Sequence, residues 1–248
     1  MSLSSRGRAR IGVLVPFTNT NLEPDMALLC PDGVSLHVAR LGGYDEDEIP
    51  DETQMRALGA ADLDTPLALL SGAKPDVILY GCTSATLTNG PVFDQDLSAR
   101  INSCSGAATV TAAGALICAL RALNVQTVGF ASPYVPAIND EAVGFLRDMQ
   151  IETVNRSEFG EALNNAEQGA LTPVDVMALG RAADHPKAGA IVLSCTDMRS
   201  VEVIEELEQE LGKPVITSNQ AMMFNALSTL GISDPICGFG RLLRETRG

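Results

Sequence analysis

The chain repeats one plan twice along its 248 residues. Three short stretches in the first half have counterparts, in the same order, in the second half. The matched positions are Gly12 and Gly129, Cys82 and Cys195, and Thr111 and Thr217, which lie 117, 113 and 106 residues apart. One chance match would mean little, but three in the same order at nearly the same offset indicate a duplicated unit. The chain is therefore expected to fold as two related halves.

Within each half, short continuous apolar runs alternate with longer segments of helical spacing. The runs are 11–15, 34–38, 77–80, 128–130, 191–193 and 215–216, and the helical segments are 62–71, 111–123, 139–149, 201–211 and 220–230. Continuous apolar runs suit strands that are buried on both faces of a parallel sheet. Their alternation with helices predicts an α/β fold made of two pseudosymmetric Rossmann-like (flavodoxin-like) domains with parallel sheets.

The repeat also suggests where the domains divide. We predict an N-terminal α/β domain over residues 1–118 and a C-terminal α/β domain over residues 119–218. The remaining segment, 219–248, is predicted to form a C-terminal helix that can pack back on the first domain.

Acidic residues exceed basic ones, with 31 Asp and Glu against 17 Lys and Arg and a formal net charge of −14. Nucleic acids and anionic membrane surfaces are bound mainly through clustered basic residues, so this balance disfavours both as partners. No apolar run approaches the length of a membrane span, and the apolar stretch near the N-terminus is too short for a signal-peptide core. We expect a cytoplasmic protein.

Several common kinds of site are disfavoured by the residues. Only two histidines occur, His37 and His185, and no two cysteines form a CxxC pair, so a metal site is not expected. The chain has no GxxxxGKS/T phosphate loop and no GxGxxG string after a strand. Neither histidine belongs to the repeat, which disfavours a Ser-His-Asp triad.

Two of the six cysteines, Cys82 and Cys195, occupy matched positions. Each follows a predicted buried strand and precedes a Thr and then a helical segment. Ligands of parallel α/β sheets bind outside the carboxyl ends of the strands, where a helix N-terminus lowers the pKa of a thiol. A cysteine taken at random is more often a buried core residue, but the duplication favours a reactive pair. The cysteines without a matched partner are expected to be structural: Cys30, Cys104, Cys118 and Cys237.

Polar loops follow the first predicted strand of each half. The loop 16–23 carries Thr and Asn side chains that suit recognition of a carboxylate by neutral donors, although the same residue types also cap helices. Tyr134 lies in the corresponding loop of the second half. Its phenol is either a donor to a substrate or part of a half-buried packing tyrosine.

These motifs resemble the aspartate/glutamate racemase superfamily, and within it the branch of maleate cis-trans isomerases and arylmalonate decarboxylases. The resemblance covers nearly the whole chain. The matching strings are PFTNTNLE (16–23), YGCTSAT (80–86), PY (133–134), SCTDMR (194–199) and GKPVITSNQ (212–220), of which the last is the most family-specific. The resemblance implies a site without a cofactor, placed between two pseudosymmetric domains, in a homodimer or homotetramer.

The resemblance also implies roles for single residues. The catalytic residues would be Cys82 and Cys195. The implied substrate-binding residues are Asn19, Thr83, Ser84, Tyr134, Asn165 and Thr196, with Asn164 as an alternative to Asn165. Decarboxylases of the branch keep only the later cysteine, whereas this chain has both. We therefore expect a maleate isomerase-like enzyme that converts a small unsaturated dicarboxylate from cis to trans through two cysteines.

Three alternatives stay open from the sequence. They are an arylmalonate-type decarboxylase, a racemase of a small carboxylic or amino acid, and a small-acid binding protein without catalysis. Asp197 departs from the family pattern and leaves the substrate open, because a carboxylate beside a thiolate disfavours that thiolate. Only Arg199 and Lys213 among the motif residues discussed are basic and either can point elsewhere, so a dianionic substrate would be bound by neutral donors.

Overall fold

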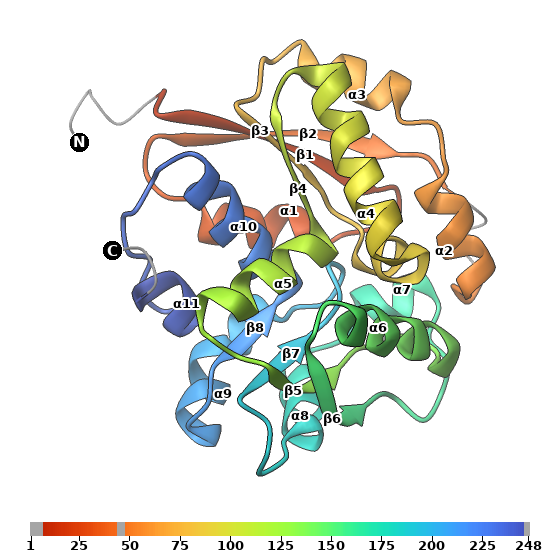
Figure 1. Cartoon of the computed structure of the whole chain (residues 1–248), viewed down its shortest axis with the longest axis vertical. Coiled ribbons are helices and arrows are strands. Elements are labelled where there is room, and N and C mark those ends of the chain that lie inside the picture. The colour runs from red at the N-terminus through yellow and green to blue at the C-terminus, as the bar shows by residue number, and fades with distance from the viewer. Residues whose placement is uncertain (1–6, 44–47, 246–248) are drawn as a thin grey trace.

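The computed structural model describes residues 7–43 and 48–245, and their strands form two four-stranded sheets in which all pairs are parallel. The first sheet contains β1 (Ala9–Pro16), β2 (Val34–Leu41), β3 (Val77–Tyr80) and β4 (Ala108–Thr111), and the second contains β5 (Thr127–Ala131), β6 (Glu152–Ser157), β7 (Ala190–Leu193) and β8 (Val215–Thr217). The strand orders, β2-β1-β3-β4 and β6-β5-β7-β8, are the same, which confirms the predicted pair of α/β units (Figure 1).

The matched glycines Gly12 and Gly129 have the same place in the two sheets. Each lies in the middle of a strand that pairs on both sides, β1 or β5. A Cβ on Gly129 would lie 2.1 Å from the Ala183 carbonyl oxygen, and a Cβ on Gly12 would lie 3.1 Å from the Leu70 side chain. The repeated glycines therefore let a covering helix approach the centre of each sheet closely.

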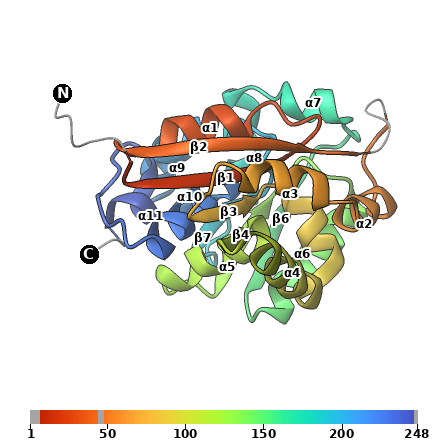
Figure 2. The same ribbon diagram turned by 90° about the horizontal axis from the view of Figure 1, so that it is seen from above.

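Helices fill the connections between strands, and two more follow the last strand. They are α1 (Leu22–Leu29), α2 (Glu52–Gly59), α3 (Asp64–Ser71), α4 (Thr83–Ser105), α5 (Ala112–Ala122), α6 (Pro136–Asp148), α7 (Asn165–Gly169), α8 (Pro173–Ala183), α9 (Ile204–Leu211), α10 (Ser218–Thr229) and α11 (Gly240–Glu245). Figure 2 shows β2, β1, β3 and β4 following one another across the first sheet. No helix of the described residues is long and apolar enough to cross a membrane.

The helical segment predicted at 220–230 is present as α10, but the segment 219–248 is not one continuous helix. Gly231, with a φ of 66°, and Pro235 interrupt it, so that α10 and α11 form two separate helices. Helix α10 packs against α5 and α1 beside the first sheet, as Figure 1 shows, whereas α11 contacts α9 and β8 of the second. Residues 246–248 lie outside the described residues. The division of the chain at residue 118 stays a prediction.

Candidate active site

Cys82 lies where the first sheet meets its longest helix. Strand β3 ends at Tyr80, and Cys82 is the residue that precedes the first turn of α4. Its side chain is buried, its sulfur lies 3.7 Å from the Ser84 hydroxyl oxygen, and the backbone N–H of Ala85 donates to the thiol. The sequence placed this thiol at a helix N-terminus, and the structure agrees.

Cys195 follows β7 in the same way, but no helix begins beside it. Residues 196–198 form bends, a 3₁₀ turn occupies Val201–Val203, and α9 begins only at Ile204. The helical segment predicted at 201–211 is present, but it begins several residues after Cys195, so this thiol does not lie at a helix N-terminus as expected. The backbone N–H of Asp197 donates to the Cys195 sulfur at 3.3 Å.

Burial dominates the proton affinity of both thiols. It raises the pKa of Cys195 to about 12, with a smaller contribution from the nearby Asp197 carboxylate. It also raises the pKa of Cys82, which the Ala85 N–H and the Ser84 hydroxyl partly offset. The predicted lowering of the thiol pKa values is thus wrong for both cysteines, since removing a thiolate from water outweighs the donors around it.

Tyr134 lies close to both thiols. Its buried phenol hydrogen-bonds with the Cys195 thiol and with the Ser84 hydroxyl, and burial raises its pKa well above the usual range. Neutral phenol is a hydrogen-bond donor at every physiological pH. Tyr134, for which the sequence allowed either a substrate-binding or a packing role, therefore contacts groups from both cysteine motifs.

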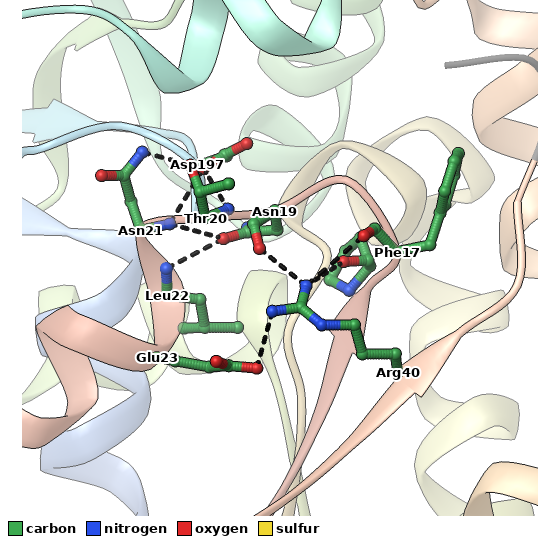
Figure 3. Close-up of polar contacts among 9 residues, drawn as sticks. Phe17, Asn19, Thr20, Asn21, Leu22, Glu23, Arg40 and Asp197 are labelled. Atoms are coloured by element: carbon green, nitrogen blue, oxygen red, sulfur yellow. Dashed lines mark hydrogen bonds and ion pairs between the residues drawn. The ribbon is translucent and has the colours of Figure 1, made fainter.

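Thr196 joins the two cysteine loops directly. Its hydroxyl donates to the Gly81 carbonyl oxygen at 2.9 Å and accepts from the Asn19 side-chain amide at 3.0 Å. The side-chain carbonyl oxygen of Asn19 (Oδ1) in turn accepts from the backbone N–H groups of Asn21 at 3.1 Å and Leu22 at 2.8 Å, at the start of α1 (Figure 3). Asn19 therefore does both things that the sequence suggested, since it caps a helix and reaches into the site.

One partly open cavity of about 40 Å³ brings most of the predicted residues together. Its wall consists of Pro16, Phe17, Thr18, Asn19, Pro50, Met55, Leu58, Cys82, Ser84, Tyr134, Asn165, Gln168, Cys195, Thr196 and Asp197. No Lys or Arg belongs to this wall among the described residues. Arg199 pairs with Glu202 at 2.7 Å, and Lys213 pairs with Asp184 at 2.6 Å, so both basic motif residues point elsewhere.

Two of the predicted assignments are refined by their positions. Asn165 lines the cavity, whereas Asn164 caps α7 by accepting from the Glu167 N–H. Thr83 does not belong to the wall, and its hydroxyl donates to Ser218 at 2.9 Å.

Sequence reasoning missed part of the wall. Met55 and Leu58, spaced three residues apart on α2, give it an apolar side, and Gln168 on α7 adds a polar group. Spacing on α2 shows that Met55 and Leu58 share a face, but no local signal tells that this face meets Cys82. The described residues contain no group of three or more His, Cys, Asp or Glu side chains that could hold a metal ion.

Comparisons with known proteins agree on one family. The chain is 29% identical to a maleate isomerase of Nocardia farcinica over 96% of this chain and 97% of the relative. It is 26% identical to an arylmalonate decarboxylase of Bordetella bronchiseptica, over 94% and 92%. A solved Nocardia farcinica maleate cis-trans isomerase, a cysteine-to-serine mutant with a covalently bound succinylcysteine intermediate, superposes with a TM-score of 0.86 at 28% identity, covering 96% of this chain and 98% of that one. The family model described as arylmalonate decarboxylase matches residues 11–243, and the chain therefore belongs to this family.

Proposed function

We propose that this protein is a cofactor-independent isomerase that converts a small unsaturated dicarboxylate, with maleate as the first candidate, from cis to trans. The observation that carries the proposal is the pair Cys82 and Cys195 on the wall of one cavity, with the Tyr134 phenol close to both thiols. The trapped succinylcysteine in a related isomerase supports a route through a carbon–sulfur bond.

In the proposed mechanism, the Cys82 thiolate forms a bond to one olefinic carbon of maleate. The π-electron pair moves onto the other carbon and its carboxylate as an enediolate, and Cys195 gives its proton to that carbon. The central bond is now single and rotates. Cys195 then takes a proton back, the double bond re-forms, and the bond to Cys82 breaks. Covalent catalysis of this kind replaces one high barrier with several lower ones.

Neutral donors have to hold the negative charge of this substrate. The cavity wall offers the amides of Asn165 and Gln168 and the hydroxyls of Thr18, Ser84 and Tyr134. None of the described residues that line the wall is a Lys or an Arg. Such preoriented donors stabilise an enediolate more in a dry cavity than in water. We propose Asn19, Thr83, Ser84, Tyr134, Asn165 and Thr196 as the substrate-binding set, with Thr83 acting through its backbone because its hydroxyl faces Ser218.

The direct test is conversion of maleate to fumarate, followed by proton nuclear magnetic resonance. We expect turnover by the wild type and loss of turnover in both C82S and C195S. The matched control is C118S, because Cys118 lies on α5 and does not line the cavity. Turnover that survives in C82S or in C195S would contradict the two-thiol mechanism.

The apolar side of the cavity, formed by Phe17, Met55 and Leu58, favours a second candidate, decarboxylation of a malonate with an apolar substituent. Incubation with alkyl- and aryl-malonates, alkyl-maleates and chiral amino acids separates the candidates. Carbon dioxide release identifies a decarboxylase, and loss of optical rotation identifies a racemase. Binding without any conversion identifies a small-acid binding protein. A homodimer or homotetramer stays a prediction, which sedimentation of the purified protein tests.

A further inference from the structure

The two cysteine motifs differ at the second residue after the thiol. Ser84 follows Cys82 and Thr83, whereas Asp197 follows Cys195 and Thr196. Ser84 places a hydroxyl 3.7 Å from the Cys82 sulfur. Asp197 instead presents its backbone N–H to the Cys195 sulfur and directs its carboxylate to the other half of the chain. Matched positions thus hold a neutral donor beside one thiol and a carboxylate beside the other.

The Asp197 carboxylate is surrounded by donors from the loop that follows β1. Its Oδ1 accepts from the backbone N–H of Thr20 at 2.9 Å, the backbone N–H of Asn21 at 3.1 Å and the Asn21 side-chain amide at 2.8 Å (Figure 3). The Thr20 hydroxyl lies 3.4 Å away. Burial raises the pKa of Asp197 above its usual value, and these converging donors offset part of that rise because they stabilise the carboxylate.

Arg40, on β2, holds the same loop from its carbonyl side. Its guanidinium donates to the backbone carbonyl oxygens of Asn19 at 2.7 Å, Pro16 at 3.2 Å and Phe17 at 3.4 Å. It also forms an ion pair with Glu23 at 2.8 Å. Figure 3 shows the loop between the guanidinium and the carboxylate. Two opposite charges therefore fix a segment that forms part of the cavity wall, each through a different set of backbone groups.

We propose that Asp197 is a positioning residue that fixes the cavity-lining loop 16–21 against the Cys195 loop and, through its charge, makes Cys195 rather than Cys82 the thiol that keeps its proton. The second part deepens the proposed function and rests on it, because it concerns which cysteine transfers the proton, whereas the loop contact stands without it. The ionisable groups that face Cys195 are Asp197 from its own loop, Tyr134 from the segment after β5 and Cys82 from the first half. Among them Asp197 is the carboxylate.

The test uses D197N and D197A, with E202Q as the matched control because Glu202 pairs with Arg199 nearby without lining the cavity. Iodoacetamide alkylation of Cys195 and Cys82 is followed against pH by peptide mass spectrometry, alongside KM and kcat for maleate. Asparagine keeps an oxygen that can accept from the loop but removes the charge, and alanine removes both.

In D197N we expect the alkylation midpoint of Cys195 to fall by about one pH unit, the effect of removing one nearby like charge, while that of Cys82 stays in place. KM should stay within about twofold in D197N and rise about tenfold in D197A, which corresponds to roughly 1.4 kcal/mol of lost binding. An unchanged Cys195 midpoint in D197N, or equal shifts of both thiols, would overturn the charge assignment, and an unchanged KM in D197A would overturn the loop assignment. If the wild type does not turn over maleate, the proposed function fails. In that case the two alkylation midpoints decide the charge assignment. Dissociation constants for maleate, measured in place of KM, decide the loop assignment. Absence of measurable maleate binding to the wild type would then count against the loop assignment.

Discussion

The Thr196 hydroxyl donates a 2.9 Å hydrogen bond to the Gly81 carbonyl oxygen. Each of these residues is the immediate neighbour of a candidate catalytic cysteine, and they follow strands of different sheets, β3 and β7. The two thiols therefore keep a fixed relationship through one side chain, and a change in either loop is transmitted to the other.

We predict that T196V destabilises the fold and lowers activity. Valine has the same shape as threonine but offers no donor to Gly81 and no acceptor to the Asn19 amide, both of them buried. Leaving buried partners unpaired costs about 1–3 kcal/mol of unfolding free energy. Urea denaturation measures this loss, and T196S is the control because it keeps the hydroxyl. Equal stabilities of T196V and the wild type would contradict a stabilising role for the Thr196 hydrogen bonds to Gly81 and Asn19.

Tyr134 is expected to act through its hydroxyl. Y134F keeps the ring, and thus the packing, but removes the group that hydrogen-bonds with Cys195 and Ser84. Removing one preorganised donor to a developing oxyanion lowers kcat by about 10²–10³-fold. Steady-state kinetics with maleate measures this effect, and thermal unfolding verifies that the variant is folded. A kcat within a few-fold of the wild type would exclude Tyr134 from the reaction.

Activity should rise with pH across the neutral range. Burial raises the pKa of Cys82, so the reactive thiolate is a minor form at neutral pH and becomes more abundant as the pH increases. Cys195, whose pKa is raised to about 12, stays protonated over the same range and can act as the acid. A pH profile of kcat/KM from roughly pH 6 to 9 tests whether activity rises with pH. A profile that falls over this range would argue against thiolate addition.

Asp25 makes the stability of the fold depend on pH. It lies on α1, accepts from the Asn219 side-chain amide at 2.8 Å, and has a pKa that burial raises from 3.8 to about 7. Between these two values the folded chain holds a proton at Asp25 that the unfolded chain has released. This group's contribution to stability is therefore fully present below about pH 3.8 and is lost as the pH rises through 7.

The variant D25N does not titrate, so its stability relative to the wild type should grow between those pH values by an amount of the order of 2–4 kcal/mol. Urea denaturation at a series of pH values measures the difference. D64N is the matched control, because the Asp64 side chain is 75% exposed and its substitution should change the stability only slightly. A difference between D25N and wild type that does not change with pH would contradict the buried, protonated state.

Much of the fold could be predicted because the repeat and the apolar runs are local patterns. The strands buried on both faces, such as β3 and β7, are continuous apolar runs and were found. Strand β6 was not found, because it is a half-exposed edge strand with the sequence ETVNRS and has no apolar run. The end of α10 was found within about one residue, because the predicted helical segment 220–230 stops before Gly231, whereas the short helix α11 was not predicted as a separate element.

The candidate site was predictable only where chemistry and repetition coincide. Cys82 and Cys195 were recognised because they repeat, and the cavity brings them together. Their raised pKa values were not predicted, since burial depends on how the two halves close over the thiols. Asp197 was noticed as an unusual residue, but its contact with Thr20 spans 177 positions and is set by tertiary packing alone.

The central claim is that Cys82 forms the bond to substrate while Cys195 handles the proton. Intact-protein and peptide mass spectrometry of C195S incubated with maleate tests it most directly. We predict an increase equal to the mass of maleic acid, located on the peptide that contains Cys82, and no such increase in C82S. An adduct on Cys195 in C82S, together with none on Cys82 in C195S, would reverse the two roles, and no adduct in either variant under conditions where the wild type turns over maleate would contradict the covalent mechanism.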